Sequence, residues 1–264
     1  MGKDEQKYLE LLAKEYPTRQ QVCREIINLN AIRNLPKGTE HFMSDLHGEY
    51  ESFCHIINNC AGVIKEKIER IFATQLSEQD RQEICTLIYY PREKLNKLWE
   101  QEMLVRDWYK VNLQNLITIA KDLSSKYTRS KVRKAMPEEF AYIIDELLHM
   151  QVDEDNNQIE YHRQIIETII NIQIADEFII ALAELIKRLA VDHLHIVGDI
   201  YDRGAHPDCL PIRDPARGQL SGPDGQPVAF QPAAAPQIFQ NPHHTVHILY
   251  SGDIGHGDGS AMKQ

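Results

Sequence analysis

The chain has 264 residues, of which 42% are hydrophobic and 26% are charged, and its formal net charge is −10. These values are typical of a globular protein with one large domain or two small ones. The acidic balance disfavours binding to nucleic acid. No apolar run approaches the roughly 18–20 residues that a membrane helix needs, and the N-terminus lacks the pattern of a secretory signal. The five cysteines form no Cys-x-x-Cys pair, which is typical of free thiols in a reducing compartment. We therefore expect a cytoplasmic protein with no nucleic-acid or membrane partner.

Residues 1–36 have a helical pattern. Thr18 followed by Gln21 predicts a capping box at a helix start. Apolar residues then recur at a helical spacing, and this stripe consists of Val22, Ile26, Ile27 and Leu29. A short strand is expected to follow through 40–43 and to end at Ser44-Asp45.

From Glu49 to about Ala190 the pattern is almost entirely helical. One helix is expected to begin at Pro137, since proline is favoured at the first helical position. A second, longer helix is expected from near Glu160 to Ala190. A short buried strand should follow over 194–197 and run into Gly198.

The chain changes character after Asp208. More than half of the 12 prolines and of the 13 glycines lie in 209–264, where few residues are charged. We expect this tail to be loop or disordered.

The first group of residues with chemical potential follows the first expected strand. It reads Ser44-Asp45-Leu46-His47-Gly48. In an extended segment, side chains two residues apart lie on the same side, so Asp45 and His47 could converge on one metal ion. A carboxylate with an imidazole suits Zn, Fe or Mn. Taken alone, the same pattern also fits an Asp that caps a turn beside a surface His.

The second group follows the second expected strand and reads Gly198-Asp199-Ile200-Tyr201-Asp202-Arg203-Gly204. Asp199 is placed to bridge two cations, and Arg203 offers a planar donor fork that matches phosphate oxygens. Asp202 could orient Arg203 or a metal ligand. An Asp-rich turn with an internal salt bridge is the alternative for this motif alone.

Together, the two motifs resemble the opening signature of the calcineurin-like metallophosphatases. The long helical block between them, and the residue sequences of 42–51 and 195–208, are similar to those of the class III fructose-1,6-bisphosphatases of bacteria. The resemblance covers about residues 1–208.

The resemblance implies an α/β fold in which an incomplete metallophosphatase core of the αββα type carries a large α-helical insertion. We expect N-terminal helices and a first core strand in 1–48, and a helical insertion or cap in 49–190. The second core strand with its Gly-Asp motif should lie in 191–208, ahead of the divergent tail in 209–264.

The resemblance also implies a function. Asp45, His47 and Asp199 would take the first metal of a binuclear Mn²⁺ site, and Asp199 would also reach the second metal. Arg203 would contact the substrate phosphate, with Asp202 beside it. The implied reaction is removal of the 1-phosphate of fructose 1,6-bisphosphate, a small phosphorylated sugar, in gluconeogenesis. The sequence leaves homo-oligomerisation open.

One departure limits this expectation. The family continues with a Gly-Asn-His-Asp segment that completes the second metal site, and this chain contains no Asn-His dipeptide. We expect the truncated chain to be a poor enzyme. Two alternatives remain: another phosphoesterase of the same superfamily, or a helical interaction module without catalysis.

Overall fold

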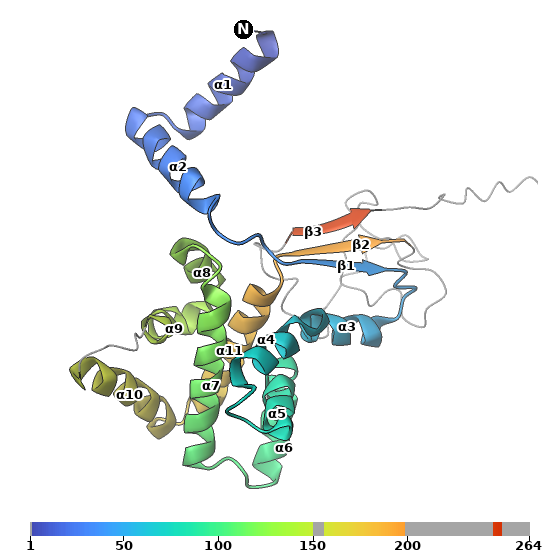
Figure 1. The fold of residues 1–264 in the computed structure, drawn as a ribbon, viewed down its shortest axis with the longest axis vertical. Helices are drawn as coiled ribbons and strands as arrows, with labels where there is room; N and C mark the ends of the chain where they lie inside the picture. The colour runs from blue at the N-terminus through green and yellow to red at the C-terminus, as the bar shows by residue number, and fades with distance from the viewer. Residues whose placement is uncertain (1, 150–155, 199–244, 250–264) are drawn as a thin grey trace, which may run out of the picture.

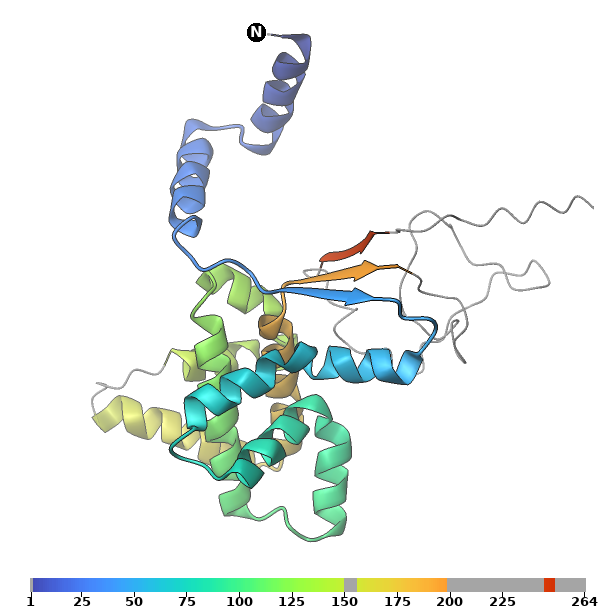
Figure 2. The same cartoon turned by 45° about the vertical axis from the view of Figure 1, so that its right-hand side comes forward.

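The computed structural model describes residues 2–149, 156–198 and 245–249. They form a small parallel sheet and a larger block of helices (Figures 1 and 2). In chain order, the helices and strands are α1 (Lys3–Glu15), α2 (Arg19–Ile32), β1 (Glu40–Ser44), α3 (Tyr50–Asn58), α4 (Val63–Phe72), α5 (Glu78–Tyr89), α6 (Pro91–Glu100), α7 (Arg106–Ser124), α8 (Arg129–Ala135), α9 (Ala141–Leu148), α10 (Asn156–Asn171), α11 (Ala175–Ala190), β2 (His193–Val197) and β3 (Thr245–Leu249), with short 3₁₀ turns at Cys60–Gly62 and Glu138–Phe140.

The sheet has the strand order β1-β2-β3, and both strand pairs are parallel. Glu40 pairs with His193 at one end of the β1–β2 ladder, and Ser44 pairs with Val197 at the other. Parallel neighbours cannot be joined by a tight turn and need a long crossover. The whole run of helices from α3 to α11 is that crossover, and it connects two short strands that lie side by side (Figure 1).

The third strand differs from the expectation for the tail. Thr245–Leu249 lies in the segment predicted to be loop or disordered, yet these residues pair with β2. Their run of Val, His, Ile and Leu has the composition of a strand, and the proline-rich sequence before it masked this short signal. The remainder of 199–264 lies outside the described residues.

One face of the sheet packs on α3. Met43, Leu46 and Ile196 form a buried apolar cluster with Phe53 and Ile57 of α3. On β2, buried and half-buried side chains alternate, so this strand buries one face fully and the other in part. The cluster fixes α3 beneath the carboxyl end of β1.

The helical block has its own core, centred on α11 and α7. Most of the apolar face of α11 is buried, and it packs closely along α7. The two clusters of buried residues are separate in composition. The sheet with α3 and the helical block therefore each bury their own apolar surface.

The prediction of one helix from near Glu160 to Ala190 is wrong, because α10 and α11 are separated by a sharp turn. Gln173 has a left-handed backbone, with φ 62°. Its N–H donates to the Ile170 carbonyl, and the next N–H, of Ile174, donates to the Ile169 carbonyl. This is the hydrogen-bond pattern that commonly ends a helix at a glycine. Here glutamine occupies the position, so the sequence carries no obvious stop.

The helix expected at Pro137 also begins later than predicted. Pro137 has an extended backbone with ψ 129°, and a 3₁₀ turn over Glu138–Phe140 precedes α9. The helix buries Ile144, Leu147 and Leu148.

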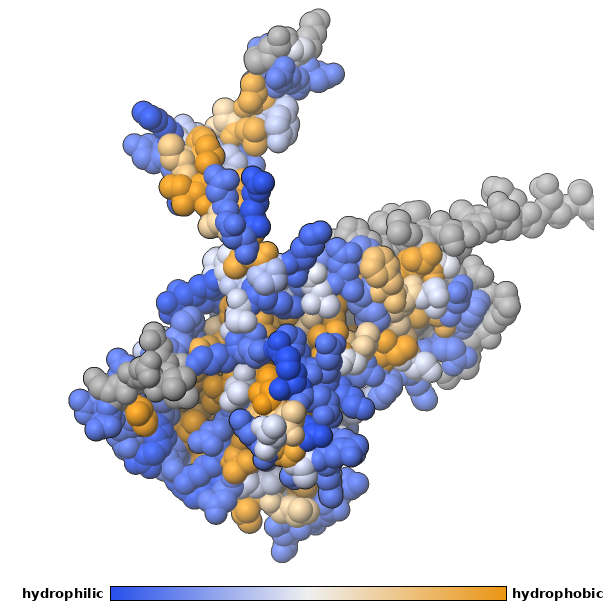
Figure 3. All heavy atoms as spheres, viewed as in Figure 1, coloured by the Kyte–Doolittle hydropathy of each residue, from blue (hydrophilic) through white to orange (hydrophobic). Residues whose placement is uncertain are grey.

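The N-terminal helices stand away from the rest of the molecule (Figure 1). The capping box at α2 is confirmed, because the Thr18 hydroxyl accepts from Gln21 N–H and the Gln21 side chain accepts from Thr18 N–H. The predicted stripe on α2 does not face a core, however, and Ile27 is 69% exposed. Orange patches on these helices in Figure 3 show the uncovered apolar side chains.

At the level of fold class, the α/β prediction with a large helical block is confirmed. A two-sheet metallophosphatase sandwich is not present among the described residues, which hold a single three-stranded sheet. Within the same part of the chain, no helix is long and apolar enough to cross a membrane.

Candidate metal site at the carboxyl end of the sheet

The predicted ligands Asp45 and His47 lie just past the carboxyl end of β1. The N–H of Asp45 donates a hydrogen bond to the Val197 carbonyl oxygen at 3.0 Å, which continues the ladder one residue beyond the Ser44–Val197 pair. Asp45 is thereby held beside the end of β2, where Gly198 follows. Ligands in open α/β sheets bind at the carboxyl ends of the strands, so the described part of the site lies where such a site is expected.

An extended backbone was predicted for this segment, but the structure has a left-handed one. Asp45 has φ 53° and His47 has φ 47°, with Gly48 at φ 72°. Left-handed backbone at a residue other than glycine costs on the order of 1–3 kcal/mol, and such residues cluster at functional sites. Asp and His adopt it more readily than most residues. The two side chains therefore share a side because the chain coils tightly here, and not because they are two residues apart in an extended strand.

Gly198 allows Asp45 to approach the end of β2. Its φ of 85° favours glycine. A Cβ atom at this position would collide with Asp45 Oδ1 and lie 3.2 Å from its Cγ. Gly198 begins the second motif, and the sequence carried no predicted role for it. The structure shows that it makes room for the Asp45 carboxylate.

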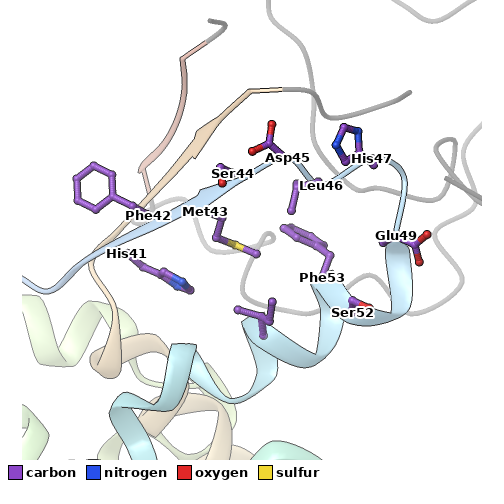
Figure 4. A pocket seen from close by; sticks show the side chains of 11 residues that line it. His41, Phe42, Met43, Ser44, Asp45, Leu46, His47, Glu49, Ser52 and Phe53 are labelled. Atoms are coloured by element: carbon purple, nitrogen blue, oxygen red, sulfur yellow. The ribbon is translucent and has the colours of Figure 1, made fainter. Parts of the chain in front are cut away.

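Figure 4 shows Asp45 and His47 on one side of the chain, away from Met43, Leu46 and Phe53. A pocket of about 370 Å³ lies at this end of β1, and both Asp45 and His47 are among the residues that line it. Its lining combines these polar groups with apolar side chains such as Met43 and Phe53.

The donor chemistry at this end of the sheet fits a divalent metal in part. Asp45 supplies carboxylate oxygens and His47 an imidazole, a combination that Mn, Fe and Zn accept. Within 2–149 and 156–198, no three His, Cys, Asp or Glu side chains are gathered as ligands. The other predicted site residues, Asp199, Asp202 and Arg203, lie outside the described residues. Asp199 directly follows Gly198 in the sequence.

The part of the chain that holds both motifs is similar to known proteins. The chain matches the family described as Firmicute fructose-1,6-bisphosphatase over residues 7–211. It is 56% identical over 208 residues to "Fructose-1,6-bisphosphatase class 3" of Clostridium acetobutylicum, a match that covers 79% of this chain and 31% of that protein. The class 3 enzyme of Clostridium botulinum strain Loch Maree is 58% identical over 202 residues, which is 76% of this chain and 30% of the relative.

The chain thus spans somewhat less than a third of the length of these curated relatives. No solved structure matches it. The family match covers both motifs and the helical block between them. The chain therefore belongs to the Firmicute fructose-1,6-bisphosphatase family.

Proposed function

We propose that these residues form the first half of a metal-dependent phosphatase site that removes the 1-phosphate of fructose 1,6-bisphosphate. The observation that carries the proposal is the placement of Asp45 and His47 just past the end of β1, where the Asp45 N–H donates a hydrogen bond to Val197, two residues before Asp199. Family membership supports the substrate. On the same ground we assign the whole enzyme to gluconeogenesis in the cytoplasm.

Each residue has a role that its chemistry supports. Asp45, His47 and Asp199 would hold a divalent cation, with Mn²⁺ as the proposed metal. A cation bound there would polarise a phosphoryl oxygen and lower the pKa of water. Arg203 would hold phosphate oxygens with its donor fork, and Asp202 would orient that guanidinium.

We further propose that the 264-residue chain alone hydrolyses its substrate weakly. It contains no Asn-His pair, so a second cation would have few ligands besides Asp199. Loss of metal ligands should lower metal affinity or activity by more than the roughly 10–100-fold that follows loss of the groups that support the ligands.

The test is release of phosphate from fructose 1,6-bisphosphate by the purified chain with Mn²⁺, with fructose 6-phosphate and p-nitrophenyl phosphate as comparison substrates. We expect slow release that Asp199→Ala abolishes and that Asp107→Ala, a change of an exposed carboxylate on α7, leaves intact. If the wild-type chain turns over its substrate fast and Asp199→Ala abolishes this activity, the proposal of weak hydrolysis is wrong. Preference for another phosphoester would indicate a different phosphoesterase, and absence of Mn²⁺ binding would indicate a helical interaction module.

A further inference from the structure

The β1–β2 pair is anchored at the end opposite the candidate metal site by one buried carboxylate, Asp192. Its residue is 5% exposed. The N–H of Thr39 donates to Asp192 Oδ2 at 2.7 Å, and the N–H of Asp192 donates back to the Thr39 carbonyl at 2.9 Å. These two bonds join the residue before β1 to the residue before β2.

Groups from the helical block surround the same carboxylate. Lys131 of α8 donates to Asp192 Oδ1, and the Tyr127 hydroxyl lies 2.7 Å from Oδ2. Lys126 Nζ lies 3.7 Å from Oδ2 and donates to the Thr39 hydroxyl at 2.9 Å. Burial alone would raise the pKa of Asp192, but hydrogen bonds from Lys131, Tyr127 and Thr39 outweigh it and hold the pKa below its usual value. The group is therefore a charged acceptor that both lysines and the Thr39 N–H stabilise.

The position of this contact matters for strand register. A shift of one residue turns every side chain of a strand to the opposite face. The Thr39–Asp192 contact lies one step before the Glu40–His193 pair, and the Asp45–Val197 hydrogen bond lies one step after the last pair. Gly38 leaves room for the carboxylate, since a Cβ there would lie 2.9 Å from Asp192 Cγ.

We propose that Asp192 is a positioning residue, which sets the register of β1 on β2 and so holds Asp45 beside Gly198 at the far end of the ladder. The inference deepens the proposed function, because the position of Asp45 matters for catalysis only if it is a ligand. Through α8, the helical block is tied to the geometry of the metal site without contacting it.

The chain offers a matched control. Asp145 of α9 is also 5% exposed and also pairs with cations of α8, with Arg133 Nε at 3.1 Å and Arg129 Nη2 at 3.4 Å. None of its recorded partners belongs to β1. Asp145→Asn should therefore loosen α8 as Asp192→Asn does, without freeing Thr39.

The experiment compares wild type, Asp192→Asn, Asp145→Asn and Gly38→Ala by hydrogen exchange and by Mn²⁺ binding. Gly38→Ala displaces the carboxylate while leaving every charge in place, so it serves if Asp192→Asn folds poorly. We expect exchange of the 40–45 amides, normalised to those of α11, to rise about tenfold in Asp192→Asn and Gly38→Ala, as loss of a charged hydrogen bond implies. Asp145→Asn should not show this rise.

Mn²⁺ affinity can be measured from the electron paramagnetic resonance signal of free Mn²⁺. It should fall about tenfold in the same two variants and stay unchanged in Asp145→Asn. Equal exchange of 40–45 in Asp192→Asn and Asp145→Asn would overturn the positioning role. If wild type binds no Mn²⁺ while exchange still responds selectively, the proposed function fails and the register role stands.

Discussion

The backbone N–H of Asp45 donates a hydrogen bond to the carbonyl oxygen of Val197, 3.0 Å away, across the carboxyl end of the β1–β2 pair. The two residues are more than 150 positions apart in the sequence. The intervening helices are the crossover that brings them together. This contact places the first predicted motif directly beside the start of the second.

Gly198→Ala should disturb this contact more than its backbone conformation alone implies. Gly62 has almost the same φ, 84°, with no atom within 4 Å of a Cβ, so Gly62→Ala is the matched control. Each change should cost about 1 kcal/mol from left-handed backbone. Gly198→Ala should cost more and weaken Mn²⁺ binding, because its Cβ displaces the Asp45 carboxylate. Equal melting temperatures and equal Mn²⁺ affinities in the two variants would contradict this.

Phe53→Ala should destabilise the sheet by about 3–5 kcal/mol, the usual cost of removing a buried aromatic side chain. Phe53 is 1% exposed and joins α3 to β1 and β2. Because the helical block has a separate core, hydrogen exchange should accelerate in 40–57 and much less in α7 and α11. Trp99→Ala, at a residue 72% exposed, should leave both regions unchanged. Uniform acceleration in Phe53→Ala would show that the two cores unfold as one.

His41 should make the fold less stable in mild acid. Burial lowers the pKa of His41 below its ordinary value of 6.5. As pH falls through 6.5, the unfolded chain takes up a proton that the folded chain resists, so stability present at pH 7.5 is lost towards pH 5. His41→Gln should reduce the difference in melting temperature between pH 7.5 and 5.5. His55→Gln, at an exposed residue, should keep the wild-type difference; if His41→Gln keeps it too, the burial argument is wrong.

Thr18→Ala should cost α2 about 1 kcal/mol, because it removes the hydroxyl that caps the helix. Since α2 has no buried residue, the loss should appear as faster amide exchange in 19–32 and leave the main melting transition in place. A lower melting temperature for the whole molecule would show that α2 packs on it in solution.

Local signals in the sequence predicted the elements that depend on local chemistry. The Thr18 capping box and the strands ending at Ser44 and Val197 follow from residues within each segment, and the structure confirms them. The break at Gln173 could not be predicted in this way, because a left-handed glutamine carries no glycine or proline signal. Its cause is tertiary, since the turn lets both α10 and α11 pack against α7.

The sequence predicted which residues form the candidate site, which stays a prediction, but it did not predict their geometry. Asp45 and His47 were chosen by residue type, while their left-handed backbone and the close approach of Asp45 to Gly198 appear only in the structure. Asp192 received no role, because its partners come from Thr39 and from the α7–α8 region, far away in sequence. The roles of Asp199, Asp202 and Arg203 stay predictions.

The measurement that tests the shared cation most directly is Mn²⁺ titration of wild type, Asp45→Ala, Asp199→Ala and the double variant, followed by electron paramagnetic resonance. If both carboxylates hold the same ion, each single change should weaken binding strongly, and the double change should add little, as expected for coupled groups. Binding that neither substitution alters, or losses that simply add, would show that residues 45 and 199 do not share a cation.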